Sequence, residues 1–240
     1  MEPGMIDVLI IHYNTPELTE AAIRSLWKHT PDARVTLLDN SDRRPFLRCG
    51  NSPVFTYIDN TNGQIVDWDK WLAKFPDKRP SPENNWGSAK HCYSVEVCLD
   101  MFPNGFVLMD ADVLIKRDIT PLCDRSAHFS GTIVCDSRKV KNRIDRLSPC
   151  LCWINTPLLR PYGIRYFNPD KMWKLHSYEP NCAYDTGAWF LEAVSRAGLE
   201  GNIIDIKDYI EHFRHASWKS RPVEKWLNKH KKLWEGEPIA

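Results

Sequence analysis

The sequence predicts an α/β fold in which a mostly parallel sheet is flanked by helices, as a single domain with a C-terminal helical tail. Short apolar runs bounded by turn residues alternate with longer segments of helical periodicity, which is the pattern of βα units. The clearest run, Phe106–Met109, follows Asn104-Gly105 and leads straight into Asp110 and Asp112, as a buried parallel strand does at its carboxyl end. The 240 residues, 42% of them hydrophobic, suffice for one large core.

Charge and hydropathy argue against two broad classes of protein. A net charge of +1 is unlike a dedicated nucleic-acid-binding protein, which is usually strongly basic. No stretch approaches the roughly 18 apolar residues of a membrane span, and Met1–Gly4 lacks signal-peptide character. We therefore expect a cytoplasmic protein.

The cysteines are expected to be structural. The eight cysteines are scattered, and several fall within apolar periodic segments, which favours buried free thiols. A zinc site is a weaker alternative because the spacing contains no CxxC. Its candidate ligands would be Cys150, Cys152, His176 and Cys182.

The first βα unit is predicted from an apolar strand, Val8–Tyr13, and a helix over Pro16–His29. Thr15 suits the N-cap of that helix, and Pro16 suits its first position. A strand joined to a helix by a short polar junction is typical of the start of a nucleotide-binding sheet. Asn14 and Thr15 can cap the helix, contact a ligand, or do both.

Two further strands and a second helix follow. Arg34–Leu38 is a strand that ends at Asp39, and Val54–Asp59 is the next strand. The helix that ends near Met101 carries Lys90 in its first turn, where a cation opposes the helix dipole. A phosphate bound at this helix start would relieve that conflict.

Asp110 and Asp112 leave the sheet where ligands of open α/β sheets bind. Two carboxylates this close repel each other unless a cation lies between them, and carboxylate oxygens suit Mg²⁺ or Mn²⁺. The competing interpretation is a strand end followed by an Asp-rich turn.

The second half of the chain contains three predicted strands and a helix. The strands are Phe129–Asp136, Cys150–Leu159 and Asn202–Ile206, and the helix opens at Asp185 and ends at Gly198. Asp185 suits the N-cap of that helix, and Gly198 suits its C-terminal end.

Five segments together resemble the nucleotide-sugar-dependent glycosyltransferases of the GT-A fold, especially the family 2-like group. The resemblance runs from about Val8 to Ser217. Its segments, in order, are Ile10–Thr15, Leu37–Ser41, Asn85–Ala89, Asp110–Asp112 and a late His212. It implies a Rossmann-like GT-A domain over 1–217, with a nucleotide-sugar-binding half to about 115, an acceptor half after it, and a tail over 218–240.

The resemblance also implies site residues. Asp112, with Asp110 and His212, would hold Mn²⁺ or Mg²⁺, and His215 is a second candidate for the histidine. Asp185 would be the general base, although the family's usual Glu-Asp pair is Tyr184-Asp185 here. The donor-binding residues would be Tyr13, Asn14, Thr15, Asp39, Asn85, Gly87, Lys90, Asp110, Ala111 and Asp112.

The implied reaction moves a sugar from a nucleoside-diphosphate sugar to a glycan, lipid-linked or other hydroxyl acceptor. A nucleotidyltransferase and a non-catalytic nucleotide-sugar-binding protein are the alternatives; the first usually has a Gly-rich loop after its first strand, which is missing here. Segment 214–234 carries seven Lys or Arg against one acid, Glu224. Its tryptophans can pack on the domain, or the segment can contact the donor, an anionic membrane surface or a nucleic-acid backbone.

Overall fold

The computed structural model describes residues 5–47, 52–67, 73, 86–135, 144–172, 184–213 and 222–236. The strands are β1 Ile6–His12, β2 Ala33–Asp39, β3 Phe55–Asp59, β4 Phe106–Asp110, β5 Val113–Ile115, β6 Phe129–Val134, β7 Arg146–Ile154, β8 Asn202–Ile203 and β9 Ile210–His212. The α-helices are α1 Pro16–His29, α3 Trp86–Cys98, α4 Thr156–Leu159, α5 Pro169–Met172, α6 Ala188–Arg196, α7 Val223–Lys229 and α8 Lys231–Trp234. Short 3-10 helices lie at Leu99–Met101, Thr120–Leu122, Arg160–Tyr162 and Ile206–Asp208.

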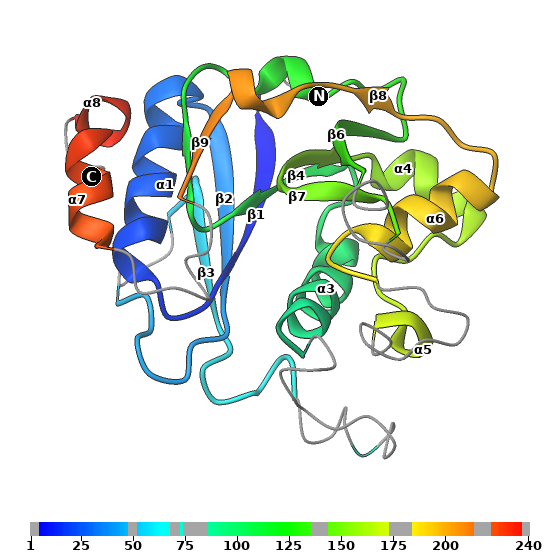
Figure 1. The fold of residues 1–240 in the computed structure, drawn as a ribbon. Coiled ribbons are helices and arrows are strands. Elements are labelled where there is room, and N and C mark those ends of the chain that lie inside the picture. The colour runs from blue at the N-terminus through cyan, green and yellow to red at the C-terminus, as the bar shows by residue number, and fades with distance from the viewer. Residues whose placement is uncertain are drawn as a thin grey trace.

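The strands of the main sheet lie in the order β3-β2-β1-β4-β7-β6-β8 (Figure 1). β1 pairs in parallel with β2 and β4, and β2 with β3. β7 is antiparallel to both β4 and β6, whereas β8 is parallel to β6. Only β7 therefore runs against the other strands of this sheet, and the predicted mostly parallel α/β fold is confirmed.

Alternation along β1 explains why helices cover both faces of the sheet. Leu9 and Ile11 belong to a core cluster that includes residues of α3 and α6. Val8 and Ile10 belong to a second cluster, which includes residues of α1. Successive side chains of a strand point to opposite faces, so a strand of continuous apolar residues must be covered on both. Figure 1 shows α1 on one side of the sheet and α3 with α6 on the other.

A small second sheet pairs β5 with β9, antiparallel. Beside it, the C-terminal helices α7 and α8 lie along α1 (Figure 1). Leu227 of α7 is buried with Leu18 of α1 and Leu114 of β5. The Lys28 ammonium also donates to the carbonyl oxygen of Lys232 at 2.6 Å.

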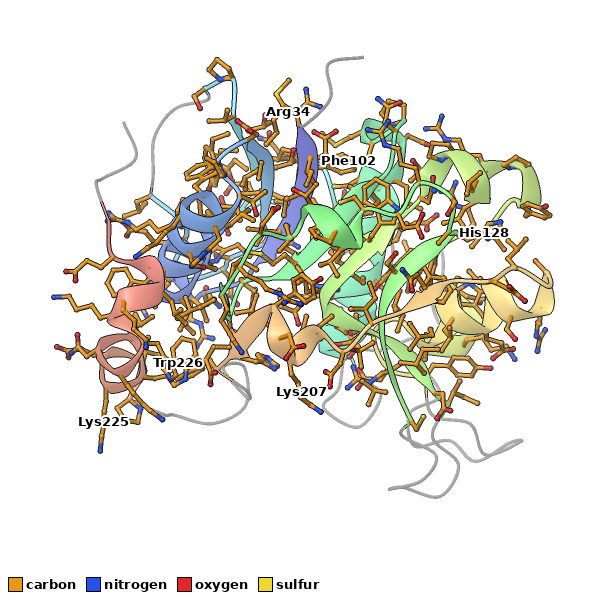
Figure 2. All side chains as sticks on the ribbon, turned by 90° about the horizontal axis from the view of Figure 1, so that it is seen from above. Arg34, Phe102, His128, Lys207, Lys225 and Trp226 are labelled. Carbon is orange, nitrogen blue, oxygen red and sulfur yellow. The ribbon has the colours of Figure 1, made fainter. Side chains whose placement is uncertain are left out.

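The tail thus packs on the domain through its apolar side chains, including Trp226 and Trp234. Trp226 meets Phe213 edge to face, with ring centroids 5.2 Å apart. Figure 2 shows Trp226 and Lys225 at the side of the molecule away from His128. Lys225 is exposed, so the cationic face of α7 stays at the surface. No helix in the described part of the chain has both the length and the apolarity needed to cross a bilayer.

Two predicted boundaries in the second half of the chain were wrong. The strand expected over Cys150–Leu159 begins at Arg146 and ends at Ile154, and helix α4 follows it. Pro157 explains this end, because proline suits the first turn of a helix and cannot donate to a sheet ladder. The strand expected over Asn202–Ile206 is only Asn202–Ile203.

The helix expected to open at Asp185 begins at Ala188, with Gly187 at the N-cap. Gly187 has φ 82°, and a Cβ there would lie 2.1 Å from the Leu147 carbonyl oxygen. Only glycine fits such a position, so the chain turns here, and Asp185 lies before the cap. The expected end of this helix is correct, since Gly198 has φ 68° directly after its last turn.

Candidate active site

The site lies at the carboxyl edge of the parallel strands. Ile11 of β1 pairs with Leu38 of β2 and with Asp110 of β4, so these strands end at one level. Polar side chains begin at that level, with Asp39 after Leu38 and Asp110 at the end of β4. The topology therefore brings these polar groups to one edge, where ligands of open α/β sheets bind.

Two antiparallel registers bring distant residues to this edge. Met109 of β4 pairs with Leu151 of β7, so one further step along the ladder places Asp110 opposite Cys150. In the small sheet, Val113 pairs with His212, and the Phe213 amide donates to the Asp112 carbonyl oxygen at 2.9 Å. Residues far apart in the sequence thus meet beside the end of β4.

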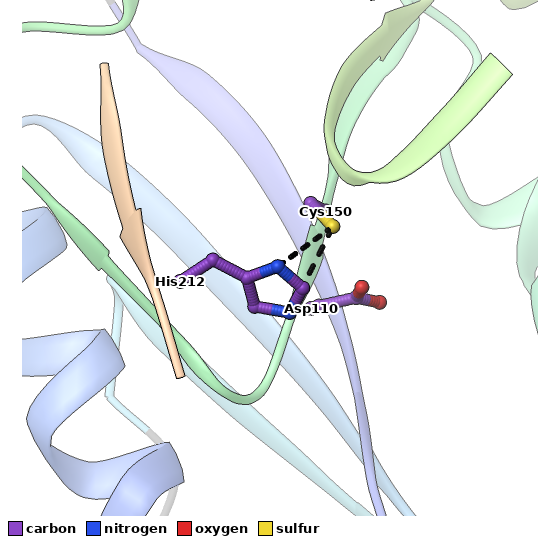
Figure 3. Close-up of side chains that lie close together, drawn as sticks. All are labelled: Asp110, Cys150 and His212. Atoms are coloured by element: carbon purple, nitrogen blue, oxygen red, sulfur yellow. Dashed lines mark hydrogen bonds between the residues drawn. The ribbon is translucent and has the colours of Figure 1, made fainter. Parts of the chain in front are cut away.

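Asp110, Cys150 and His212 form a cluster whose ligand atoms all lie within 4.8 Å of one another. The Cys150 Sγ atom is 3.6 Å from His212 Nδ1 and 3.9 Å from Nε2. Figure 3 shows the three side chains close together, with the two sulfur–imidazole contacts dashed. Carboxylate, thiolate and imidazole are all ligands of divalent metals, so this donor set fits a metal ion.

Asp112 joins the cluster through His212, because its Oδ1 atom lies 3.3 Å from His212 Nε2. Burial alone would lower the pKa of His212, but its contacts with Asp112 and Cys150 outweigh burial and raise that pKa to about 11. The surroundings of His212 therefore favour positive charge, which an imidazolium or a metal ion can supply. The three residues predicted as metal ligands, Asp110, Asp112 and His212, come together in the structure; His215 lies outside the described residues.

Sequence reasoning did not place Cys150 or His91 in this cluster. His91 Nε2 lies 3.5 Å from Asp110 Oδ1, so the imidazole pairs with the carboxylate at the end of β4. The signal for His91 was its place in the first turn of a helix, where a cation opposes the dipole. Cys150 was a candidate only for a zinc site with other partners, and its place beside Asp110 depends on the β4–β7 register.

The first turns of α3 connect three parts of the site. The Ser88 hydroxyl donates to Asp185 Oδ1 at 2.7 Å. The Lys90 ammonium lies 5.7 Å from the centroid of the Tyr13 ring. His91 faces Asp110, so one short segment reaches the β1–α1 junction, the cluster of Asp110, Cys150 and His212, and the segment before α6. Burial lowers the pKa of Lys90, although Asp42 acts in the opposite direction.

The β1–α1 junction is held by a strained residue. Asn14 has φ 56°, the positive φ of a left-handed residue, and its side-chain oxygen accepts from the Arg43 and Arg44 amides at 3.1 and 2.9 Å. The Asn14 amide group and the Tyr13 hydroxyl both donate to Asp42. These hydrogen bonds fix the loop after β2 against the junction, and those from Asn14 and Tyr13 lower the pKa of Asp42. Asp42 is a further residue that sequence reasoning missed.

The other residues predicted to bind the donor lie in different surroundings. Thr15 precedes α1 as its N-cap, but its side chain makes no capping hydrogen bond. Gly87 is exposed, and a Cβ there would meet nothing within 4 Å. Ala111 is half-buried between the two acids, and Asn85 lies outside the described residues.

Asp39 is fully buried, and its carboxylate is satisfied internally. Oδ1 accepts from the Ser41 amide at 2.9 Å; Oδ2 accepts from the Phe46 amide at 2.7 Å and from the Tyr57 hydroxyl at 2.9 Å. In this arrangement the carboxylate organises the loop after β2. Its predicted contact with a nucleotide-sugar donor stays a prediction.

Asp185 lies between a hydroxyl, an amide and a guanidinium. Besides Ser88, the Thr186 amide donates to its Oδ1 atom at 2.7 Å, and Arg146 Nη1 lies 3.7 Å from Oδ2. Arg146 is the first residue of β7, the strand that also carries Cys150. The acid is therefore held in place by residues of α3 and β7, the two elements that also carry His91 and Cys150.

No family model and no curated protein sequence matches the chain. The chain is similar in structure to GT-A-type glycosyltransferases. The galactosyltransferase LgtC, solved with donor and acceptor sugar analogs, is 13% identical with a TM-score of 0.48, over 98% of this chain and 85% of that one. The mannosyltransferase PcManGT from Pyrobaculum calidifontis, solved with GDP-Man and Mn²⁺, is 14% identical with a TM-score of 0.45, over 98% and 65% of the two chains. GlyE of Streptococcus pneumoniae TIGR4 is 12% identical with a TM-score of 0.45, over 85% and 46%.

Identities of 12–14% and TM-scores under 0.5 do not transfer a residue's role from one chain to another. The roles of Asp110, Cys150, Asp185 and His212 are therefore inferred from their own geometry.

Proposed function

We propose that the chain is a metal-dependent glycosyltransferase that moves a sugar from a nucleoside-diphosphate sugar to an acceptor hydroxyl. The observation that carries the proposal is the cluster of Asp110, Cys150 and His212 at the carboxyl edge of the sheet, beside the start of α3. A divalent ion held there would neutralise a departing diphosphate, which is Lewis-acid help to a leaving group.

The residues that would hold Mn²⁺ or Mg²⁺ are Asp112, Asp110 and His212. Their oxygen and nitrogen atoms suit a divalent ion, and the raised pKa of His212 marks a place built for positive charge. The ion would meet two carboxylates that otherwise repel each other at the edge of β4. These residues would hold the ion, which would supply positive charge beside the donor's phosphates.

The donor's diphosphate would lie between the metal cluster and the first turns of α3. Backbone amides at a helix start and its dipole favour an anion, and Lys90 adds a cation there. Lys90 also lies over the Tyr13 ring, which joins this region to the β1–α1 junction. The base and ribose would then occupy the junction formed by Tyr13, Asn14 and Thr15.

Asp185 would act as the general base. It would take the proton of the acceptor hydroxyl as that oxygen attacks the anomeric carbon and the bond from this carbon to the diphosphate breaks. Ser88 and Arg146 hold the carboxylate in place. The acceptor would be a glycan, a lipid-linked sugar or another hydroxyl compound, and the exposed lysines of the tail could bring the enzyme to an anionic membrane surface.

The test is to incubate the protein with Mn²⁺ and a panel of nucleotide sugars, and to measure released nucleoside diphosphate. We expect release from at least one donor by the wild type and by Asp124→Asn, a control in an exposed turn where the carboxylate accepts from the Ser126 amide and hydroxyl. Asp110→Asn should release none above background. Equal release by Asp110→Asn, or no release by the wild type from any donor, would contradict the proposal.

A further inference from the structure

The thiol of Cys150 sits at metal-ligand distance from its neighbours. In a tetrahedral site with bonds of about 2.0–2.3 Å, the ligand atoms lie roughly 3.3–3.8 Å from one another. The Cys150 Sγ to His212 Nδ1 distance of 3.6 Å falls in that range. The carboxylate of Asp110 completes a set whose ligand atoms lie within 4.8 Å of one another.

We propose that Cys150 is a direct ligand of the metal, alongside Asp110 and His212. The site would then have one sulfur, one nitrogen and one or more oxygen ligands, and would prefer thiophilic ions such as Zn²⁺, Co²⁺ or Cd²⁺ over Mg²⁺. This inference rests on the metal site of the proposed function and specifies which ions that site selects.

The fold distinguishes Cys150 from Cys152 on the same strand. Residues two apart on a regular strand share a face. However, the pairing of β6 with β7 shifts register between Gly131 and Ile133. Cys152 is fully buried in the core cluster of α3 and α6, whereas Cys150 is partly buried and packs against the cluster on the α1 side. Cys150 is therefore the thiol presented to His212.

The coordination step balances simply. The ion replaces the thiol proton of Cys150, which passes to solvent, so a sulfur–metal bond forms as the sulfur–hydrogen bond breaks. His212 binds as neutral imidazole, so its imidazolium proton also passes to solvent as the nitrogen–metal bond forms, and Asp110 binds as carboxylate. Two anionic ligands then offset the charge of a divalent ion at a half-buried position.

The competing explanation is that the Cys150 thiol is only a weak hydrogen-bonding partner that orients the His212 ring. In that case the sulfur stays protonated when a metal binds, and metal preference depends on Asp110 and His212 alone. The two explanations differ in whether a sulfur–metal bond forms, which spectroscopy can detect without any enzyme assay.

The experiment is a titration of the metal-free full-length protein with Co²⁺ alone, followed by absorption spectroscopy and equilibrium dialysis. We expect a sulfur-to-cobalt charge-transfer band in the near ultraviolet that saturates at one Co²⁺ per chain. The band should be retained in Cys123→Ser, a control at another partly buried thiol outside the cluster. It should vanish in Cys150→Ser, whose preference for Cd²⁺ over Mg²⁺ should also fall at least about tenfold.

The charge-transfer band of the wild type and of Cys123→Ser tests the inference even if Cys150→Ser does not fold. Bound Co²⁺ without a charge-transfer band in the wild type would overturn the role of Cys150 and leave the metal site of the proposed function intact. A band that persists in Cys150→Ser would also overturn it. No bound Co²⁺ in the wild type would overturn both proposals.

Discussion

His212 Nε2 lies 3.3 Å from Asp112 Oδ1, although one hundred positions separate the two residues in the sequence. The pairing of β5 with β9 creates this contact, since Val113 lies opposite His212. Phe213, the next residue, packs on Trp226 of α7, so the C-terminal helices support the strand that carries His212. The position of His212 beside Asp112 therefore depends on contacts with the C-terminal helices.

Asp112→Asn should abolish metal-dependent donor binding and leave the fold intact. The amide keeps the size of the carboxylate but loses the negative charge that a metal ion or an imidazolium at His212 requires. Thermal-shift titrations with Mn²⁺ and nucleoside diphosphates measure this. Asp124→Asn is the control and should keep the wild-type shift. A normal metal-dependent shift in Asp112→Asn would remove this residue from the site.

Asp39→Ala should lower the free energy of unfolding by about 2–4 kcal/mol, because two amides and one hydroxyl lose a buried acceptor. Urea denaturation measures this loss. If the carboxylate also reads the base, donor binding should weaken by roughly 1–3 kcal/mol.

Tyr57→Phe serves as the control for this prediction. It removes one internal hydrogen bond of Asp39 and should cost about 1 kcal/mol of stability without changing donor affinity. Normal donor affinity in Asp39→Ala would limit this carboxylate to organising the loop after β2.

Asp185→Asn should lower turnover by about 10²–10⁴-fold, with donor binding and melting temperature near those of the wild type. Asp185 does not cap α6, since Gly187 occupies the N-cap, so a loss of activity could not be assigned to lost capping. Ser88→Ala removes one hydrogen bond to Asp185 and should cost far less turnover. Activity of Asp185→Asn within a few-fold of wild type would favour another base or a retaining mechanism.

Acid should destabilise the protein partly through His12. Burial lowers the pKa of this residue, although Asp39 and the Arg44 carbonyl act in the opposite direction. The unfolded chain therefore binds more protons than the folded chain as pH falls below about 6.5, and stability falls by up to about 1.4 kcal/mol per pH unit. Urea denaturation at pH 7.5 and 5.5 should show a smaller pH dependence in His12→Gln. An unchanged dependence would show that His12 titrates normally in the fold.

The sequence predicted most of the parallel half of the fold, because each strand there is a local apolar run followed by a polar junction. Phe106–Met109 with Asp110, and Thr15 with Pro16, are examples in which neighbouring residues carry the signal. Cys150 could not be placed in the same way. Its position depends on the antiparallel register of β7 with β4, and register is a property of two distant segments.

The boundary at Gly187 shows the same limit at shorter range. Asp185 is a good N-cap by residue type, but Gly187 lies so close to the Leu147 carbonyl oxygen that the chain turns two residues later. The metal role of Asp110, Asp112 and His212 stays a prediction, although the fold brings the three residues together.

Removal and return of the metal tests the central claim most directly. Release of nucleoside diphosphate from a nucleotide sugar would be measured on one protein sample before chelation, after exhaustive chelation and after Mn²⁺ is added back. We predict that release falls to background without metal and returns when Mn²⁺ is restored. Circular dichroism should stay the same throughout, which shows that the fold is not what is lost. Release that continues at the full rate after chelation would contradict a metal-dependent transfer.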